Sequence, residues 1–294
     1  MTITENIFSR SSTAAAYVSP IIWDDKLEKY VYDAAVFPRF AVNDTRHLNK
    51  PGRQVNYQFN AGYSMGLLTE GIATPVSELS FTQVTLTFNA YGDAKQITEE
   101  ELAQGFDYLL SDIKQNAVGS AIENRDAVIV TELLTSSGTG IYSNGKASGT
   151  ISSTDTFNTD MVADLKVAMA QSQAKECQGI VVHPEQYGDM LKLPNFVNAS
   201  QYGDGRVIRS GEIGSYIGIP IMMSNQITTA SENSITVYKA IALGRRPFVY
   251  ATKKMMTFGF EQETLRDRTI TASWWEMFGV SILRNDSVII MTSA

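Results

Sequence analysis

Residues 54–90, QVNYQFNAGYSMGLLTEGIATPVSELSFTQVTLTFNA, contain two alternating runs of apolar side chains separated by a long gap. Alternation with a period of two is typical of strands that bury one face. The apolar positions are Val55, Tyr57 and Phe59 in the first run, and Val84, Leu86, Phe88 and Ala90 in the second. The runs therefore predict two antiparallel strands joined by about 20 residues, far more than an ordinary hairpin loop contains.

The long connection, Asn60–Gln83, is rich in apolar side chains that a projecting loop cannot bury against its own base. They are Met65, Leu67, Leu68, Ile72, Pro75 and Val76. Exposed apolar groups of this kind indicate a partner surface. The alternative, that the loop folds back on its own domain, stays open from the sequence alone.

A long helix is predicted directly after the second run. Thr98 and Glu101 form a capping-box pattern, and apolar residues at helical spacing continue to Leu134. A continuous helix of this length would measure about 54 Å, whereas a compact globe of this chain length would be about 50 Å across. We therefore expect an elongated subunit, with Gly105 and Gly119 as the positions where the helix could break.

The other segments divide the chain further. Residues 1–23 have no amphipathic period and suggest an arm, and Asp24–Val36 is expected to form a short helix. Gly138–Asp155, rich in Gly, Ser and Thr, is predicted to be a connector. An α/β region then follows. The predicted strands after it are Ile235–Leu243, Phe248–Ala251, Met255–Phe260, Ile270–Trp275, Val280–Leu283 and Val288–Met291.

The sequence offers little for catalysis or for binding a metal or cofactor. Its only histidines, His47 and His183, are too few for a catalytic or metal-binding cluster, and Cys177 is expected to be a small buried residue. Gly140–Lys146 matches the first seven positions of a phosphate-binding loop, but Ala147 replaces the required Ser or Thr. We therefore predict no catalytic, cofactor-binding or metal-binding residues.

Charge and hydropathy exclude further classes. The net charge of −7 disfavours sequence-specific binding to nucleic acid. No run reaches the roughly 18 apolar residues that span a bilayer, and Thr13–Trp23 does not fit a signal peptide. We expect a protein made in the cytoplasm that does not bind membranes.

The order of arm, long two-stranded loop, long helix, α/β region and returning strands resembles the Hong Kong 97 fold of tailed-bacteriophage major capsid proteins. The resemblance covers roughly residues 20–292 and is carried by the order of several short motifs. These are Leu68–Gly71 with Pro75 and Glu78 at the loop tip, Lys95–Leu102 at the start of the spine helix, and Val181–Pro184, Gly211–Gly214 and Gly218–Pro220 in the axial domain.

This resemblance implies an α+β fold with a particular division of the chain. Residues 1–46 would form an N-terminal arm and short helix, and residues 47–97 an extended β loop. Residues 98–150 and 245–290 would form a peripheral domain with the spine helix. Residues 151–244 would form an α/β axial domain.

The resemblance also implies self-assembly into hexamers and pentamers that tile an icosahedral shell around double-stranded DNA. The subunit would be found in the virion and would be assembled in the host cytoplasm. Subunit contacts would come from Met65, Leu67, Leu68, Glu70, Gly71, Ile72 and Pro75 of the extended loop, and from Tyr17, Val18, Ile21 and Trp23 of the arm.

Two features of the sequence refine this expectation. Residues 60–83 contain no lysine, so we expect no lysine-to-asparagine crosslinks of the kind that some family members form. No long charged helical segment precedes the arm, so a separate scaffolding protein, or none, is expected. A portal and a decoration protein are further possible partners.

The alternatives to a phage capsid protein are an encapsulin-like nanocompartment shell, a phage tail or adaptor component, and an α/β enzyme with an unrecognised site.

Overall fold

The computed structural model describes residues 35–60, 67, 70, 76, 78, 81–98, 109–172, 176–193, 214–216, 218–263 and 269–294. All of them belong to one of the two units of the chain, Tyr32–Ala294. The predicted arm and residues 24–34 of the predicted short helix lie outside the described residues. The described part begins just before a 3-10 helix, η1 (Phe37–Phe40). It contains helices and three separate sheets, which confirms the predicted α+β class.

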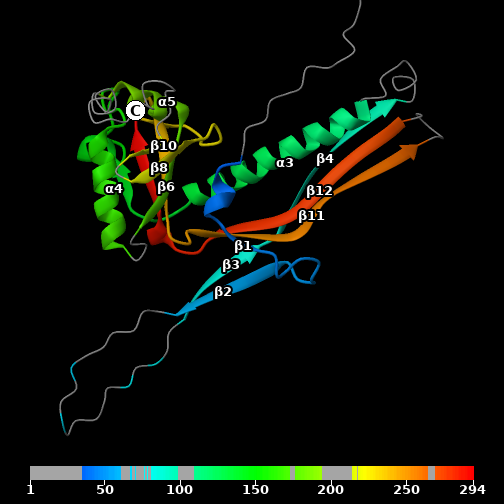
Figure 1. Ribbon diagram of the computed structural model, residues 1–294, viewed down its shortest axis with the longest axis horizontal. Helices are drawn as coiled ribbons and strands as arrows, with labels where there is room; N and C mark the ends of the chain where they lie inside the picture. Colours follow the sequence, from blue (N-terminus) through cyan, green and yellow to red (C-terminus); the bar gives the residue numbers. More distant parts are fainter. Residues whose placement is uncertain are drawn as a thin grey trace, which may run out of the picture. The chain divides into compact units, whose positions relative to one another are not determined.

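A seven-stranded mixed sheet forms the α/β part of the molecule (Figure 1). Its main path runs in the order β5-β13-β10-β6-β8-β7, and β9 pairs with β10. The strands are β5 (Gly140–Tyr142), β6 (Cys177–Val182), β7 (Ser215–Tyr216), β8 (Ile219–Met223), β9 (Ala230–Glu232), β10 (Ile235–Gly244) and β13 (Val288–Ser293).

Both faces of this sheet are buried, because its central strands alternate between two cores. In β6, Ile180 and Val182 face the first core, where they pack with helix α4 (Thr159–Gln171). Val181 faces the second core, which includes the end of the long helix. A strand covered on both sides reads as a continuous apolar run, as the sequence CQGIVV of β6 does at its end.

The predicted connector, Gly138–Asp155, is part of this fold. It contains β5, which pairs in parallel with β13, and a turn held by Asp155. The Asp155 carboxylate accepts hydrogen bonds from Lys146 Nζ at 2.6 Å and Asn144 Nδ2 at 2.7 Å. It also accepts one from Ser152 Oγ at 2.6 Å. These donors hold the pKa of Asp155 well below its ordinary value.

The second sheet has four strands in the order β1-β11-β12-β4. Its strands are β1 (Val42–Asp44), β11 (Phe248–Glu263), β12 (Thr269–Ile282) and β4 (Asn89–Thr98). The sequence predicted β11 and β12 each as two shorter strands. The breaks in the β11 pattern coincide with register shifts between Thr252 and Thr257, where β-bulges interrupt the alternation without ending the strand.

The predicted start of the long helix, just after Thr98, lies outside the described residues. Thr98 is the last residue of β4 and pairs with Thr269, so Lys95–Thr98 belongs to a strand. Strand β4 is an edge strand in which Ile97 is the only buried residue. Polar edge strands carry no apolar alternation, so the sequence pattern did not reveal this strand. Because an N-cap residue has extended backbone, the capping role of Thr98 stays a prediction.

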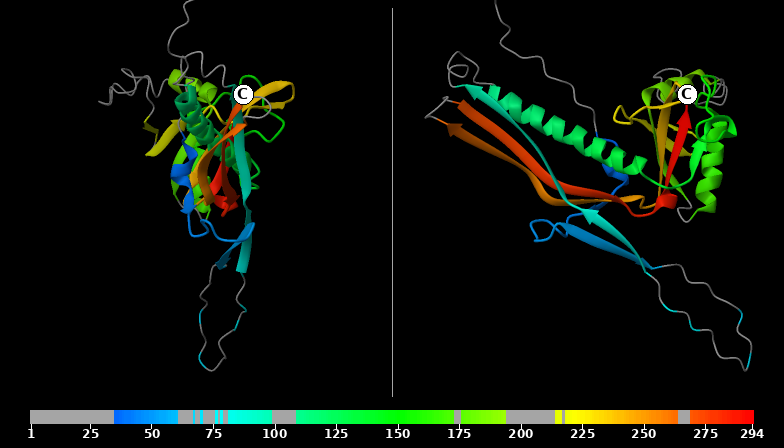
Figure 2. Two further views of the ribbon diagram at one scale, coloured as in Figure 1. Left: turned by 90° about the vertical axis from the view of Figure 1, so that its right-hand side faces the viewer. Right: turned by 180° about the vertical axis from the view of Figure 1, so that it is seen from behind.

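The described part of the long helix is α3 (Leu109–Leu134), and it is continuous through Gly119. Residues 99–108, including Gly105, lie outside the described residues. Figures 1 and 2 show α3 running along the four-stranded sheet. At its end, Ile129, Val130 and Leu133 are buried against residues of both sheets and of η1.

The third sheet is the predicted two-stranded one. Strand β2 (Gln54–Asn60) pairs antiparallel with β3 (Phe81–Thr87), with Tyr57 opposite Val84. Leu86 and Phe88 pack against the four-stranded sheet. A Cβ atom at Gly279 of β12 would lie 2.5 Å from the carbonyl oxygen of Thr87, so glycine is needed for β3 to approach this closely.

The core at the end of α3 predicts that shortening one of its buried side chains will strongly lower stability. Leu133 is fully buried, so Leu133→Ala should lower the free energy of unfolding by about 2–5 kcal/mol. Val118, on the same helix, is 45% exposed, and Val118→Ala should change it by less than about 0.5 kcal/mol. Denaturant unfolding of both variants tests this. Equal effects would show that the end of α3 does not carry the core.

The turn around Asp155 predicts a pH-dependent contribution to stability. Because the folded-state pKa of Asp155 is depressed, its contribution is present above the ordinary pKa of an aspartate and is lost as the pH falls toward the folded-state value. Asp155→Asn should therefore lower the thermal midpoint at pH 7. Its difference from wild type should shrink in acid.

Asp164→Asn, at an exposed position of α4, is the control and should leave the midpoint close to wild type at every pH. Thermal melts monitored by circular dichroism between pH 7 and pH 3 measure both variants. A difference between Asp155→Asn and wild type that stays constant over this range would contradict the assignment.

Candidate subunit-contact surfaces

The connection between β2 and β3 presents apolar side chains to solvent. Leu67 is 99% exposed and Val76 is 96% exposed. Glu70 and Glu78 are exposed as well. These two large apolar side chains therefore do not pack on the described part of the chain, and exposed apolar groups of this size are typical of contact surfaces.

The structure describes only part of the predicted contact set. Leu67 and Glu70 are placed and exposed. The remaining predicted contact residues lie outside the described residues. They are Met65, Leu68, Gly71, Ile72 and Pro75 of the loop, and Tyr17, Val18, Ile21 and Trp23 of the arm.

The root of the β2–β3 hairpin is held by a buried carboxylate. Asp44, at the end of β1, has a side chain that is 3% exposed. It accepts hydrogen bonds from Arg46 through the backbone nitrogen at 2.9 Å, Nε at 3.0 Å and Nη2 at 2.7 Å. The hydroxyl of Tyr57, in β2, donates to the same carboxylate at 2.8 Å. His47 Nε2 lies 3.6 Å from Asp44 Oδ2.

This arrangement shifts the pKa values of Asp44 and Tyr57. Hydrogen bonds from Arg46 hold the pKa of Asp44 well below its ordinary value. Burial, with the Asp44 carboxylate as a second cause, raises the pKa of Tyr57 well above its ordinary value. The cluster therefore consists of a charged aspartate and arginine with a neutral tyrosine. No sequence pattern predicts this cluster, because Tyr57 lies 13 residues from Asp44.

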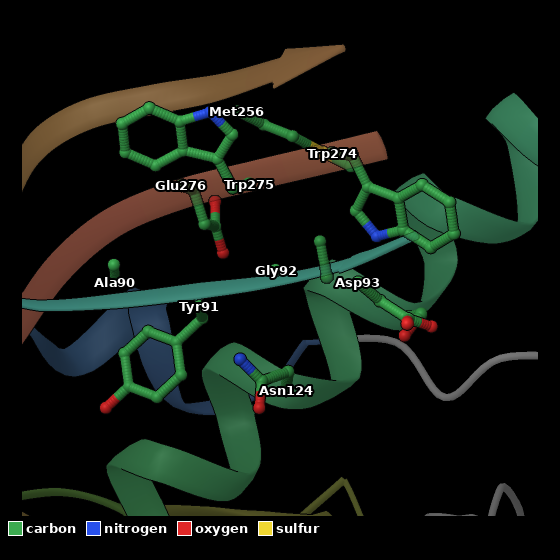
Figure 3. A pocket seen from close by; sticks show the side chains of 11 residues that line it. Ala90, Tyr91, Gly92, Asp93, Asn124, Met256, Trp274, Trp275 and Glu276 are labelled. Atoms are coloured by element: carbon green, nitrogen blue, oxygen red, sulfur yellow. The ribbon is translucent and has the colours of Figure 1, made fainter. Parts of the chain in front are cut away.

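The four-stranded sheet carries a second set of exposed apolar side chains, from the middle of β11 onward and in the middle of β12. Trp274 is 8% exposed, whereas the neighbouring Trp275 is 38% exposed. Lys254 Nζ lies 3.8 Å from the centroid of the Trp275 ring. Successive residues of a strand point to opposite faces, and Figure 3 shows the two indoles leaving β12 in different directions. Other exposed side chains here are Met255, Phe258 and Phe260.

A cavity of about 320 Å³ lies where α3 meets β4 and β12 (Figure 3). Its lining includes Tyr91, Asn124 and Glu276. Glu276 is buried and is engaged by Arg125 of α3, with Arg125 Nε 3.0 Å from Glu276 Oε1. This hydrogen bond raises the pKa of Arg125. Glu276 therefore serves to join the helix to the sheet.

Possible reactive groups elsewhere have structural partners. Burial raises the pKa of Cys177 to about 11, so its thiol is protonated at neutral pH. His183 caps helix α5 (Pro184–Lys192), where its Nδ1 accepts a hydrogen bond from the backbone nitrogen of Glu185 at 3.2 Å. His183, directly after β6, therefore serves as a helix cap.

Lys146, the lysine of the phosphate-loop match, is paired with Asp155. The match therefore reflects a structural turn. Within the described ranges, no group of three or more His, Cys, Asp or Glu residues could hold a metal ion. The helices in those ranges also include none that is long and apolar enough to cross a membrane.

Comparison with known proteins places these features in a family. A family model described as phage capsid protein matches residues 82–288, more than half of the chain. A sequence comparison with curated proteins finds no match.

Several solved structures share the fold at low sequence identity. A chain from Mycobacterium phage Che8 has a TM-score of 0.74 at 17% identity, covering 93% of this chain and 96% of the other. The acid-stable capsid of Helicobacter pylori bacteriophage KHP30 has a TM-score of 0.74 at 11% identity, covering 99% and 100%. The capsid of cyanophage Pam1 has a TM-score of 0.72 at 14% identity, covering 98% and 99%.

The arrangement of a projecting hairpin, a long helix on a four-stranded sheet and a separate α/β sheet is thus that of capsid subunits. The family match favours this structural role over the encapsulin-like and enzyme alternatives. The chain belongs to the phage capsid protein family and is a major capsid protein with the Hong Kong 97-like fold, one that forms the shell of a phage.

Proposed function

We propose that copies of this chain close an icosahedral shell, built from hexamers and pentamers, around the double-stranded DNA genome of a tailed phage. The contacts between subunits are non-covalent and come from the extended loop and the arm. The observation that carries this proposal is the exposure of Leu67 and Val76, at 99% and 96%.

The energetic argument rests on repetition of modest contacts. Burying one such side chain against a neighbour contributes about 1.5–3 kcal/mol, which is too little to hold two subunits together. In a closed shell each subunit makes several of these contacts at once, and every contact after the first is effectively intramolecular. Symmetry then repeats the same surfaces on every copy.

The division of labour along the chain is part of the proposal. Residues 1–46 act as the arm and short helix, residues 47–97 as the extended loop and residues 151–244 as the axial domain. Residues 98–150 and 245–290 form the peripheral domain. Sheet pairing supports moving residues 140–142 and 288–290 to the axial domain, since β5 and β13 pair within the seven-stranded sheet.

The negative net charge of the chain affects how the shell interacts with DNA. With a net charge of −7, the shell encloses DNA without specific binding, since the packaged DNA carries its own counterions. Assembly takes place in the host cytoplasm. A separate scaffolding protein, a portal and a decoration protein are the further partners in this proposal.

Removal of the loop tests its role in assembly. Deleting residues 62–77 leaves a short connection between β2 and β3, so the subunit should stay folded and soluble but should not assemble. Size-exclusion chromatography and negative-stain microscopy measure this.

A double variant and a control variant refine the deletion test. Leu67→Ser combined with Val76→Ser should weaken assembly, whereas Val167→Ser, at an exposed position of α4, should not. Normal shells from the deletion variant would overturn the role of the loop.

The absence of lysine from residues 60–83 predicts a shell without covalent links. Assembled particles boiled in detergent should give a single band at the monomer mass of 32.4 kDa. Particles treated with a chemical crosslinker before boiling serve as the positive control and should give a ladder. A ladder from untreated particles would contradict the prediction.

A further inference from the structure

The direction in which the β2–β3 hairpin leaves the subunit matters for any contact made by its loop. Each strand has seven residues, which corresponds to a length of about 23 Å. A rotation of about 10° at the root would therefore move the far end by about 4 Å, enough to break a packed contact.

The hairpin packs on the four-stranded sheet mainly through apolar side chains. Leu86 and Phe88 of the hairpin side pack with Val249 and Ala251 of β11. Apolar contacts hold two layers together but have little directional preference. Something directional is needed to fix the angle between the two sheets.

Asp44 supplies a directional link. Its backbone is fixed in the four-stranded sheet, where β1 pairs in parallel with β11 and Asp44 lies opposite Ala251. Its carboxylate accepts a hydrogen bond from the hydroxyl of Tyr57, whose backbone is fixed in β2 opposite Val84. This hydrogen bond therefore joins the two sheets, because each of its side chains belongs to a residue whose backbone is held in one of them.

Arg46 fixes the orientation of the carboxylate itself. Its Nε and Nη2 atoms donate one to each carboxylate oxygen, and its backbone nitrogen donates to Oδ1. Paired donors of this kind restrict rotation of the carboxylate plane. The second oxygen is thereby aimed at Tyr57.

We propose that Asp44 is a positioning residue that sets the angle of the extended hairpin, and that this angle determines the uniformity of the shell. Arg46 orients the Asp44 carboxylate, and the hydrogen bond from Tyr57 to this carboxylate restricts the position of β2. The link between angle and shell rests on the function proposed above. The link between Asp44 and the angle does not, so the two parts can be tested separately.

The angle is measured in the isolated subunit by pulsed electron paramagnetic resonance. Spin labels are attached at Gln58→Cys in β2 and Val118→Cys in α3, in a Cys177→Ala background that removes the native thiol. Wild type should give a narrow distance distribution. Tyr57→Phe and Asp44→Asn should broaden or shift it.

Tyr142→Phe, in β5 of the other large sheet, is the matched control and should leave the distribution unchanged. Tyr57→Phe deletes one hydroxyl and should lower the thermal midpoint by only roughly 2–4 °C, so a changed distribution would not reflect unfolding. In the Asp44→Asn background, Tyr57→Phe should add less than it does alone, because the two residues act through one bond. Unchanged distributions in both variants would overturn the proposal.

Particle uniformity is then compared by electron microscopy. Tyr57→Phe and Asp44→Asn should give a wider spread of particle diameters, or open shells, where wild type and Tyr142→Phe give uniform ones. Uniform shells from both variants would overturn the link between angle and shell. If wild type itself formed no shells, the proposed function would fail, and the distance measurement would still decide the role of Asp44.

Discussion

The rest of the structure depends on the packing of the end of α3 between the two large sheets. Ile129, Val130 and Leu133 share one core with Val181 and Ile241 of the seven-stranded sheet. Phe248 of the four-stranded sheet and Phe37 and Phe40 of η1 belong to the same core. Close-packed interiors transmit displacement and do not absorb it, so this core makes the described helix and both sheets one frame.

Two strand connections reinforce this frame. The chain passes from β10 of the seven-stranded sheet directly into β11 of the four-stranded sheet. After β12 it returns to the seven-stranded sheet as β13. The Arg125–Glu276 pair adds a polar link between α3 and β12. A shell subunit needs such a frame, because contacts repeated by symmetry close a shell only if every copy presents them at the same angle.

The surfaces proposed to serve assembly are attached to the frame in a different way. The hairpin rests on the four-stranded sheet at Gly279 and Leu86, where the layers approach closely, and Asp44 bonds to Tyr57 beside them. Exposed apolar groups lie beyond that root, at Leu67 and Val76. In the proposed function, stability and assembly are therefore carried by separate residues, so assembly could be disturbed in a subunit that still folds.

The sequence by itself determined the elements whose signal is local. The alternation in β2 and β3 predicted their pairing, the apolar period predicted α3 to its end, and the motif order indicated the capsid family. The tertiary structure decided β4, the unbroken lengths of β11 and β12, and the Asp44–Tyr57 and Arg125–Glu276 links. The physical reason is that a polar edge strand and a long-range ion pair owe their stability to partners distant in the chain, and periodicity records only which face of a segment is buried.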